Sequence, residues 1–256
     1  MLYHHFFSLT VVAALALLSS ALPNIPTSVN LRVEGLTTTI FEGTILTFGH
    51  NVTTPSGGNH HCDGTNDGQN PLPGPTCTSA LDDASKIFHF PFDGYVQLFF
   101  LISRCEKWCL IVVGNRYSTF STAFDDFFIT SIGGDTQTAT QFWGILLNFE
   151  FTPVGGCQQQ VKHNDEILFA FDAFNANAFL ELSGPPGAHV NTPIVVTVKD
   201  GQTGNPIAGA SVGGATTDAS GHASVVFTHL GLQSLKATKA GAIRSNKINV
   251  LVVWFL

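Results

Sequence analysis

A short run of histidine, cysteine and aspartate is the first place where residue types and spacing could support chemistry. Residues 59–63 read Asn-His-His-Cys-Asp, and imidazole and thiolate groups are common ligands of zinc and copper. Adjacent histidines project in different directions, however, and no second His/Cys pair follows at the spacing of a zinc finger. We therefore expect no metal site, and we expect His60 and His61 to be polar loop residues that are candidates for ligand contact.

Acidic residues are the other candidates for chemistry. The segment 63–68, Asp-Gly-Thr-Asn-Asp-Gly, partly imitates a calcium loop, but its twelfth position is Gly74 instead of a bidentate glutamate. The pairs Asp82–Asp83 and Asp125–Asp126 are adjacent in sequence, so their carboxylates point apart or cap a helix instead of flanking a substrate. The sequence also lacks a nucleophile elbow, a zinc-protease motif and a phosphate loop. We expect a non-enzymatic protein without a cofactor.

The N-terminal residues predict export. An apolar core from Phe6 to Leu18 precedes Ser19-Ser20-Ala21, so we interpret residues 1–21 as a secretory signal peptide. This core is shorter than the ~20 apolar residues that span a bilayer, so no stable membrane insertion is expected after cleavage. Charged residues make up only 11% of the chain and the net charge is −7, which fits a secreted protein without a nucleic-acid partner. Asn51 begins the one usable N-glycosylation sequon.

Composition changes at residues 182–187, where Leu-Ser-Gly-Pro-Pro-Gly separates a phenylalanine-rich part from one rich in Val, Ala, Gly and Thr. We therefore predict two domains, residues 22–182 and 183–256. In the first, a helix is expected over 78–87 with Thr78 or Ser79 as N-cap, and a long polar loop over 49–75. Strands are expected at 29–33, 38–48, 127–132, 142–152 and 166–172.

One helix flanked by strands predicts an α+β first domain, and a β-grasp arrangement is the favoured one. The second domain shows short apolar segments separated by turn signals. They lie at residues 194–199, 210–212, 222–227, 234–238 and 247–253. This spacing is typical of an all-β Ig-like sandwich.

Residues 95–116 fit neither domain. They are strongly apolar and include Cys105 and Cys109, so a buried hairpin or a redox pair is one interpretation. A membrane span is disfavoured by the charged residues within 104–107. We favour a third interpretation, a retained intron. The codons of residues 94–96 can contain the splice donor GTATGT that is common in fungi, and those of 115–116 can contain a CAG acceptor.

Long sequence blocks of the first domain resemble a known family. They lie at 49–58, 61–66, 80–84, 124–130, 142–148 and 154–157. Through them, residues 29–181 resemble the transcobalamin-like C-terminal domain of secreted fungal and actinobacterial surface proteins, which has no assigned function. Residues 185–253 resemble the Ig-like or carboxypeptidase-regulatory-like module that often follows it, through 200–214, 217–223 and 243–246. The resemblance implies an extracellular or cell-surface β-grasp domain and carries over no catalytic residues. The family pattern lacks residues 95–116, in agreement with a retained intron.

Five cysteines in a chain predicted to be exported make a disulfide an expectation. Cys62 with Cys157 is the favoured pair and Cys62 with Cys77 is the alternative, but the sequence alone does not choose among the three pairings of these residues. A bridge between Cys62 and Cys157 closes a long loop, so we expect it to stabilise the fold by ~3–5 kcal/mol. It would hold the Gly-rich loop against the end of a core strand.

A ligand groove could be lined by Trp143 together with Phe142, Phe149, Phe151, Phe169, Phe171 and Phe174. Because Phe149, Phe151, Phe169 and Phe171 also follow the period-2 alternation of core strands, we expect most of these rings in the core, and Phe142 and Trp143 are the candidates for ligand contact. We expect a secreted, non-catalytic surface protein that binds an unknown small ligand, as the resemblance to transcobalamin implies. The C-terminal module would act as a spacer or adhesive tail. The alternative is a cell-wall or glycan-binding adhesin, and a secreted hydrolase is the weakest hypothesis.

Overall fold

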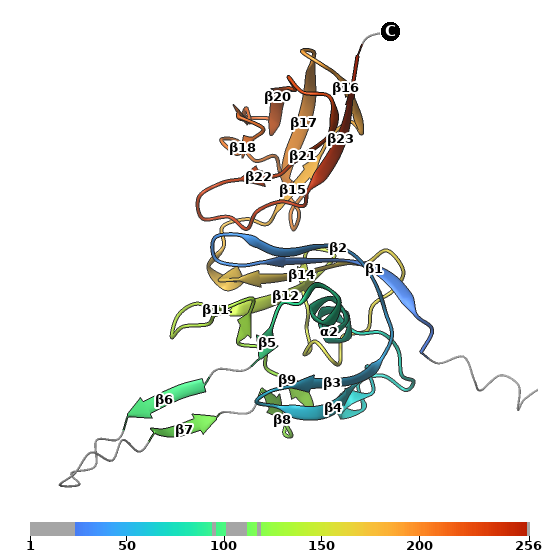
Figure 1. Cartoon of the computed structure of the whole chain (residues 1–256), viewed down its shortest axis with the longest axis vertical. Coiled ribbons are helices and arrows are strands. Elements are labelled where there is room, and N and C mark those ends of the chain that lie inside the picture. The colour runs from blue at the N-terminus through green and yellow to red at the C-terminus, as the bar shows by residue number, and fades with distance from the viewer. Residues whose placement is uncertain (1–23, 94–95, 101–111, 117–118, 255–256) are drawn as a thin grey trace, which may run out of the picture.

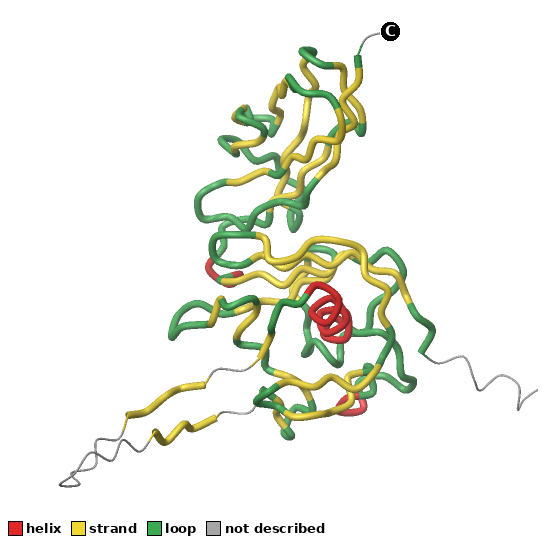
Figure 2. The backbone as a smooth tube through the Cα atoms, viewed as in Figure 1, coloured by secondary structure: helices red, strands yellow, loops and turns green. Residues whose placement is uncertain are grey.

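The computed structural model describes residues 24–93, 96–100, 112–116 and 119–254. Strands dominate the molecule, with 45% of residues in strands and 9% in helices (Figures 1 and 2). Among the described residues there is one α-helix, α2 (Cys77–Phe88), with two short 3-10 helices, η1 (Asn66–Gly68) and η2 (Ala173–Asn175). Within this part of the chain, no helix has the length and apolar character needed to cross a bilayer.

The main sheet has five strands in the spatial order β13-β12-β14-β1-β2. These are β1 (Thr27–Glu34), β2 (Thr39–Thr47), β12 (Trp143–Leu147), β13 (Glu150–Phe151) and β14 (Glu166–Phe171). β1 and β14 run parallel, and the other neighbours are antiparallel. Because side chains alternate along β1, Val29, Leu31 and Val33 face the helix while Arg32 and Glu34 lie on the opposite face. That outer face is covered by the C-terminal strands (Figure 1).

Helix α2 is fixed at both ends by its own sequence. The Thr76 hydroxyl accepts a hydrogen bond from Ser79 N at 3.0 Å, and the Ser79 hydroxyl accepts one from Thr76 N at 2.9 Å, which forms a capping box. His89 ends the helix in a left-handed conformation with φ of 58°. The helix predicted over 78–87 is confirmed, but its N-cap is Thr76 and not Thr78 or Ser79.

The predicted α+β class of the N-terminal domain is wrong, and the β-grasp assignment falls with it. The prediction assumed that the helix forms a layer of its own against the strands, but α2 is a single helix of 12 residues in a molecule that is mostly β. It also assigned 49–75 to loop, whereas this segment contains the hairpin of β3 (His50–Thr54) and β4 (Gly58–Cys62). Val52 and Thr54 point inward and their neighbours outward, so the segment has strand periodicity despite its polar composition. With many small sheets and a single helix, the molecule is consistent with an all-β fold.

Two further small sheets complete the N-terminal part. One has the order β11-β10-β5, and the other pairs β8 with β9. Their bounds are β5 (Phe92–Asp93), β8 (Phe120–Ser121), β9 (Asp126–Phe127), β10 (Ser131–Ile132) and β11 (Asp135–Thr136). The strand predicted over 127–132 is therefore divided between β9 and β10. The strand predicted over 142–152 is also divided, because Asn148 and Phe149 adopt φ of 52° and 65° and turn the chain from β12 into β13.

Strands β6 (Val96–Phe100) and β7 (Val112–Arg116) pair with each other and extend away from the main sheet (Figure 1). They occupy the two ends of the segment 95–116 that the sequence marks as a retained intron. The rest of that segment, with Cys105 and Cys109, lies outside the described residues. The intron interpretation therefore stays a prediction.

The described residues from 180 to 254 contain strands and loops but no helix. The strands form three small sheets with the orders β15-β17-β20, β16-β23-β21 and β19-β18-β22. The strands are β15 (Leu180–Ser183), β16 (Gly187–His189), β17 (Pro193–Asp200), β18 (Ser211–Val212), β19 (Ala215–Thr216), β20 (His222–Val226), β21 (Gly231–Leu235), β22 (Ala237–Thr238) and β23 (Ile248–Val253). Their inward residues, such as Val196, Val225 and Val250, form a separate apolar core. The predicted domain boundary at 182–183 lies inside β15 and stays a prediction.

Apolar and ionic contacts join the C-terminal strands to the main sheet. Leu146 and Leu168 of the sheet's outer face share an apolar cluster with Phe179, which directly precedes β15. The Glu34 carboxylate is 1% exposed and forms ion pairs with Lys236 Nζ and with Arg244 Nε at 2.7 Å. A buried carboxylate held by two cations from another part of the chain fixes how the two parts are docked.

Candidate functional site

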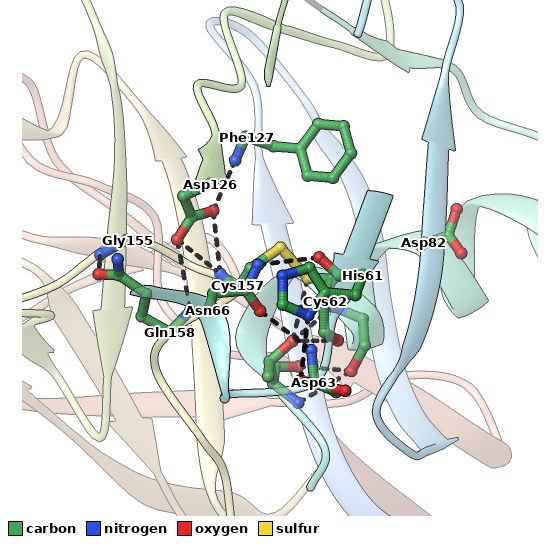
Figure 3. The surroundings of a disulfide bond; sticks show 12 residues. His61, Cys62, Asp63, Asn66, Asp82, Asp126, Phe127, Gly155, Cys157 and Gln158 are labelled. Atoms are coloured by element: carbon green, nitrogen blue, oxygen red, sulfur yellow. Dashed lines mark hydrogen bonds and ion pairs between the residues drawn. A yellow bond between two sulfur atoms is a disulfide. The ribbon is translucent and has the colours of Figure 1, made fainter. Parts of the chain in front are cut away.

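The Cys62–Cys157 disulfide, the pairing favoured from the sequence, is present in the structure (Figure 3). It joins the end of β4 to the loop after β13, across a sequence separation of 95 residues. Both cysteines are fully buried, and Gly64 N donates a hydrogen bond to Cys157 O at 2.9 Å beside the bridge. Cys77, the first residue of α2, is free and buried.

Asp126 organises the chain on the Cys157 side of the bridge. Its carboxylate accepts hydrogen bonds from Phe127 N at 2.6 Å, Cys157 N at 3.1 Å and Gln158 N at 3.3 Å (Figure 3). Burial raises the pKa of Asp126 to about 6, although these backbone hydrogen bonds act in the opposite direction. A Cβ at Gly155 would overlap this carboxylate, so a residue without a side chain is required there.

An open cleft of about 460 Å³ lies next to this loop, at the edge of the main sheet that β12 and β13 form. Its walls are mostly aromatic and come from the segment around β9, from β12–β13 and from the end of β14. The aromatic lining residues are Phe124, Phe127, Phe128, Trp143, Phe151, Phe169 and Phe174. We call this the aromatic cleft.

Two pairs of phenylalanine rings at the aromatic cleft are open to solvent. The Phe124 and Phe128 rings meet edge to face at 5.6 Å, and the two side chains are 59% and 54% exposed. The Phe151 and Phe174 rings stack at 5.0 Å with an interplanar angle of 11°, and they are 38% and 63% exposed. Exposed apolar side chains gathered around a hollow are typical of a binding surface.

The deeper part of the aromatic cleft is rigid. Trp143 is 8% exposed, its Nε1 donates a hydrogen bond to Asp135 O at 3.1 Å, and its ring meets Phe171 edge to face at 5.4 Å. Phe169 is fully buried in the main sheet below it. The cleft therefore combines an ordered floor with exposed rings at its mouth, which is how preformed small-molecule sites are built.

The aromatic cleft contains little that could perform catalysis. Asp126 is its only ionisable lining residue, and its carboxylate already accepts backbone hydrogen bonds. Thr152 and Gln158 are the polar side chains of the lining, and both make hydrogen bonds to the backbone. A hydrolytic site needs a nucleophile with a base or two facing carboxylates, and this lining offers neither.

The structure separates the four residues predicted to contact a ligand. Trp143 lines the aromatic cleft, whereas Phe142 is 40% exposed and lies outside the lining. His60 stacks on Phe120 with ring centroids 3.5 Å apart, and His61 Nε2 lies 2.9 Å from Asp125 Oδ2. Both histidines therefore hold the segment that leads into β9, behind the wall of the cleft. Asn51 of the sequon is exposed on β3, and its Nδ2 donates to Asn59 Oδ1 at 2.8 Å.

Phe124 and Phe128 are cleft residues that the sequence reasoning missed. They lie on either side of the two-residue strand β9, four positions apart, so they do not follow the alternation of a long strand. The available signal is their place in the block 124–130 that resembles the transcobalamin-like domain, whereas the strand predicted over 127–132 gave no reason to expect exposed rings.

A second group of potential metal ligands makes ion pairs within the protein. His50, Asp82 and Asp83 place ligand atoms within 4.8 Å of one another. Asp82 Oδ2, however, lies 2.8 Å from His50 Nε2 and 2.6 Å from Lys86 Nζ. The hydrogen bond to Asp82 raises the pKa of His50. This cluster fastens α2 to β3.

The fold is consistent with an all-β protein, and the aromatic cleft lies beside the loop that the disulfide holds. Residues 113–173 match the family model described as a domain of unknown function (DUF4430), which is found in transcobalamin-like proteins. The matched span contains Cys157 and every aromatic lining residue except Phe174. No curated protein matches the chain. The disulfide fits an extracellular environment.

Proposed function

We propose that this chain is a secreted, non-catalytic protein that binds a small, largely apolar ligand in the aromatic cleft. The observation that carries the proposal is the pair of exposed phenylalanine contacts at the mouth of a hollow of about 460 Å³. Sites of roughly 300–1,000 Å³ with apolar walls and few polar groups typically hold small molecules. Export rests on the N-terminal signal sequence and agrees with the buried disulfide.

The energetics favour a flat ligand. A ring system inserted between the two phenylalanine pairs would cover rings that are now open to solvent on one side. Removing apolar surface from water is worth about 25 cal/mol per Å², and ring contacts add about 0.5–1.5 kcal/mol each. Since Asp126 is committed to backbone N–H groups, specificity depends on shape and on a few hydrogen bonds to Thr152 or Gln158.

The test is a fluorescence titration of the mature protein, because Trp143 lies in the floor of the aromatic cleft. The panel contains cobalamin and planar aromatic compounds, and Trp143→Phe identifies the signal that belongs to this residue. We expect Phe128→Ala and Phe174→Ala each to weaken binding about five- to tenfold. Phe142→Ala is the matched control, since Phe142 is exposed to a similar extent but does not line the cleft. If no panel compound binds, or if Phe142→Ala has the same effect, the proposal fails.

A cell-wall or glycan-binding adhesin is the second candidate. Exposed aromatic rings also stack on sugar rings, so the same four phenylalanines support it. Sugars additionally require several polar partners, and the lining of the aromatic cleft supplies few. A pull-down on chitin, glucan and whole cell-wall material separates the two candidates. Retention that Phe128→Ala abolishes would favour the adhesin, and no retention counts against it.

A further inference from the structure

A buried arginine on the outer face of the main sheet opens onto a second hollow. Arg32 is 7% exposed, and its Nη1 donates a hydrogen bond to Arg244 O at 3.0 Å. Its guanidinium carbon lies 5.7 Å from the centre of the Phe149 ring. Among the described residues this is the one hydrogen bond that its side chain makes. A guanidinium has five N–H donors, so most of its donors lack a protein partner.

The hollow is a groove of about 340 Å³ between the sheet and the segment that leads into β23. Arg32, Glu42 and Glu166 contribute to its floor, and Phe149 and Asn249 to its walls. We call it the inter-sheet groove. It shares no lining residue with the aromatic cleft, so an inference about it does not depend on the proposed function.

The carboxylates nearest to Arg32 are engaged elsewhere. Glu34 pairs with Lys236 and Arg244, and Glu42 pairs with Lys236 at 2.8 Å while also accepting a hydrogen bond from Lys247 N. Among the described residues, no carboxylate lies within 4.0 Å of the Arg32 guanidinium. A desolvated cation without an ion-pair partner is costly, so a ligand that supplies a carboxylate would satisfy it.

Glu166 provides the opposite charge on the same face of the sheet. In the parallel pairing of β1 with β14, Asn30 lies opposite Glu166 and Arg32 lies opposite Leu168, so Glu166 is offset from Arg32 by one step of the pleat. Its carboxylate makes no ion pair among the described residues. Partial burial raises the pKa of Glu166, and the attraction of Arg32, which acts in the opposite direction, does not cancel this effect. Arg32 and Glu166 therefore line one groove without a direct ion pair between them, and Lys247 lines it as well.

We propose that the inter-sheet groove binds a free α-amino acid, with the ligand carboxylate on Arg32 and the ligand ammonium group at Glu166. A simple anion is a poorer fit, because the lining carries two acids, Glu42 and Glu166, beside the cations Arg32 and Lys247, so a ligand with both charges matches it better. The planar guanidinium suits a carboxylate, which it binds in bidentate fashion. The Phe149 ring and Leu168 form the apolar surface against which the ligand side chain packs. Because the walls come from both parts of the chain, the bound ligand also strengthens their docking.

Titration calorimetry of the mature chain with each of the common amino acids tests this proposal. We expect at least one free amino acid to bind. Its N-acetyl derivative lacks the ammonium group and its amide lacks the carboxylate, so each should bind at least tenfold more weakly. Glu166→Gln should weaken binding at least tenfold without affecting folding, since this residue is exposed. Glu150→Gln, an exposed acid of the same sheet outside the groove, is the matched control and should leave binding unchanged.

Arg32→Lys keeps the charge but loses the bidentate geometry, so it should weaken binding by a similar factor. Its unfolding transition is measured alongside, because Arg32 is buried. The proposal is overturned if no free amino acid binds at millimolar concentration, or if blocking the amino or carboxyl group has no effect. It is also overturned if Glu150→Gln weakens binding as much as Glu166→Gln does.

Discussion

Removal of the Cys62–Cys157 disulfide should lower the free energy of unfolding by about half of the value that is typical of a domain. The bridge spans 95 residues, and the chain-entropy relation gives about 4.7 kcal/mol for a loop of this length. If the ~22 residues of the segment 95–116 are absent from the natural protein, the shorter loop changes this figure by only about 0.2 kcal/mol. Both sulfur atoms are buried, so alanine at the two positions leaves small cavities that add about 1 kcal/mol each. We expect a total loss of about 5–7 kcal/mol for the double alanine variant.

Equilibrium unfolding in guanidinium chloride measures this loss, with wild type and the Cys62→Ala/Cys157→Ala variant compared at pH 7 without reductant. Cys77→Ala is the matched control, because Cys77 is equally buried but not cross-linked. It should lose only the packing contribution of about 1 kcal/mol. The reasoning is refuted if the free energy of unfolding falls in the double variant by no more than twice the decrease in Cys77→Ala, because the cross-link would then contribute nothing.

Cys77 bears on the same experiment because a free thiol near a disulfide can exchange with it. Burial raises the pKa of the Cys77 thiol, so the nucleophilic thiolate is scarce in the folded protein. Peptide mapping of the native protein should therefore find Cys62 joined to Cys157 and Cys77 reactive only after unfolding. A mixture of pairings in the folded protein would contradict this protection.

Three further predictions concern the docking of the two parts, the pH dependence and the origin of one segment. Glu34→Gln leaves Lys236 and Arg244 without their buried partner and should lower the free energy of unfolding by about 2–4 kcal/mol, against less than about 0.5 kcal/mol for an exposed acid. Because burial raises the pKa of Asp126 to about 6, this carboxyl group keeps its proton in the folded chain between pH ~4 and ~6, whereas it has lost the proton in the unfolded chain. Stability should therefore fall, by at most about 3 kcal/mol, as pH rises from ~4 to ~6, and Asp126→Asn should lack this slope. Sequencing of the transcript should show that codons 95–116 are spliced out; their presence in the mature message would refute the intron interpretation.

Strand β1 was predictable because its apolar side chains alternate with polar ones. Val29, Leu31 and Val33 are buried in the core, and the sequence assigned this strand with nearly the right bounds. The β3–β4 hairpin was not predictable in the same way. Only Val52 is an apolar inward residue of β3, and Thr54 is buried through hydrogen bonds, including one to Thr119 Oγ1 at 3.0 Å. A polar strand with one apolar inward residue, and with a buried threonine whose hydrogen-bond partner lies 65 residues away, leaves no local apolar pattern.

The helix shows a related limit. Thr76, Thr78 and Ser79 can all cap a helix, so local chemistry favours no single start. Tertiary contacts decide the matter, because Cys77 N and Thr78 N donate hydrogen bonds to Gln159 O and Gly156 O of the loop that carries Cys157. The error in fold class has a similar origin. Two-residue strands such as β9 and β10 carry no periodicity, so the extent of β structure around the helix was not visible from the sequence.

The candidate site was predictable only in its centre. Trp143 was identified because it is a large aromatic residue in a segment predicted to be a strand, and it lines the cleft. Phe151 and Phe174 become cleft residues because the turn at Asn148 and Phe149 ends β12 early and swings β13 back along it. That turn places two residues other than glycine at positive φ; asparagine tolerates this conformation, but local preferences do not predict it for Phe149. Exposure of these rings is thus a consequence of backbone geometry.

The C-terminal strands are docked against the main sheet and do not form a freely moving spacer. Linked modules move relative to each other by default when their interface is small and polar. Here Glu34 is buried between two cations from the C-terminal part, and Leu146 and Leu168 are covered by Phe179. These contacts hold the aromatic cleft at a fixed orientation to the C-terminal sheets. Any partner held by the C-terminal part would therefore face the aromatic cleft from one fixed direction.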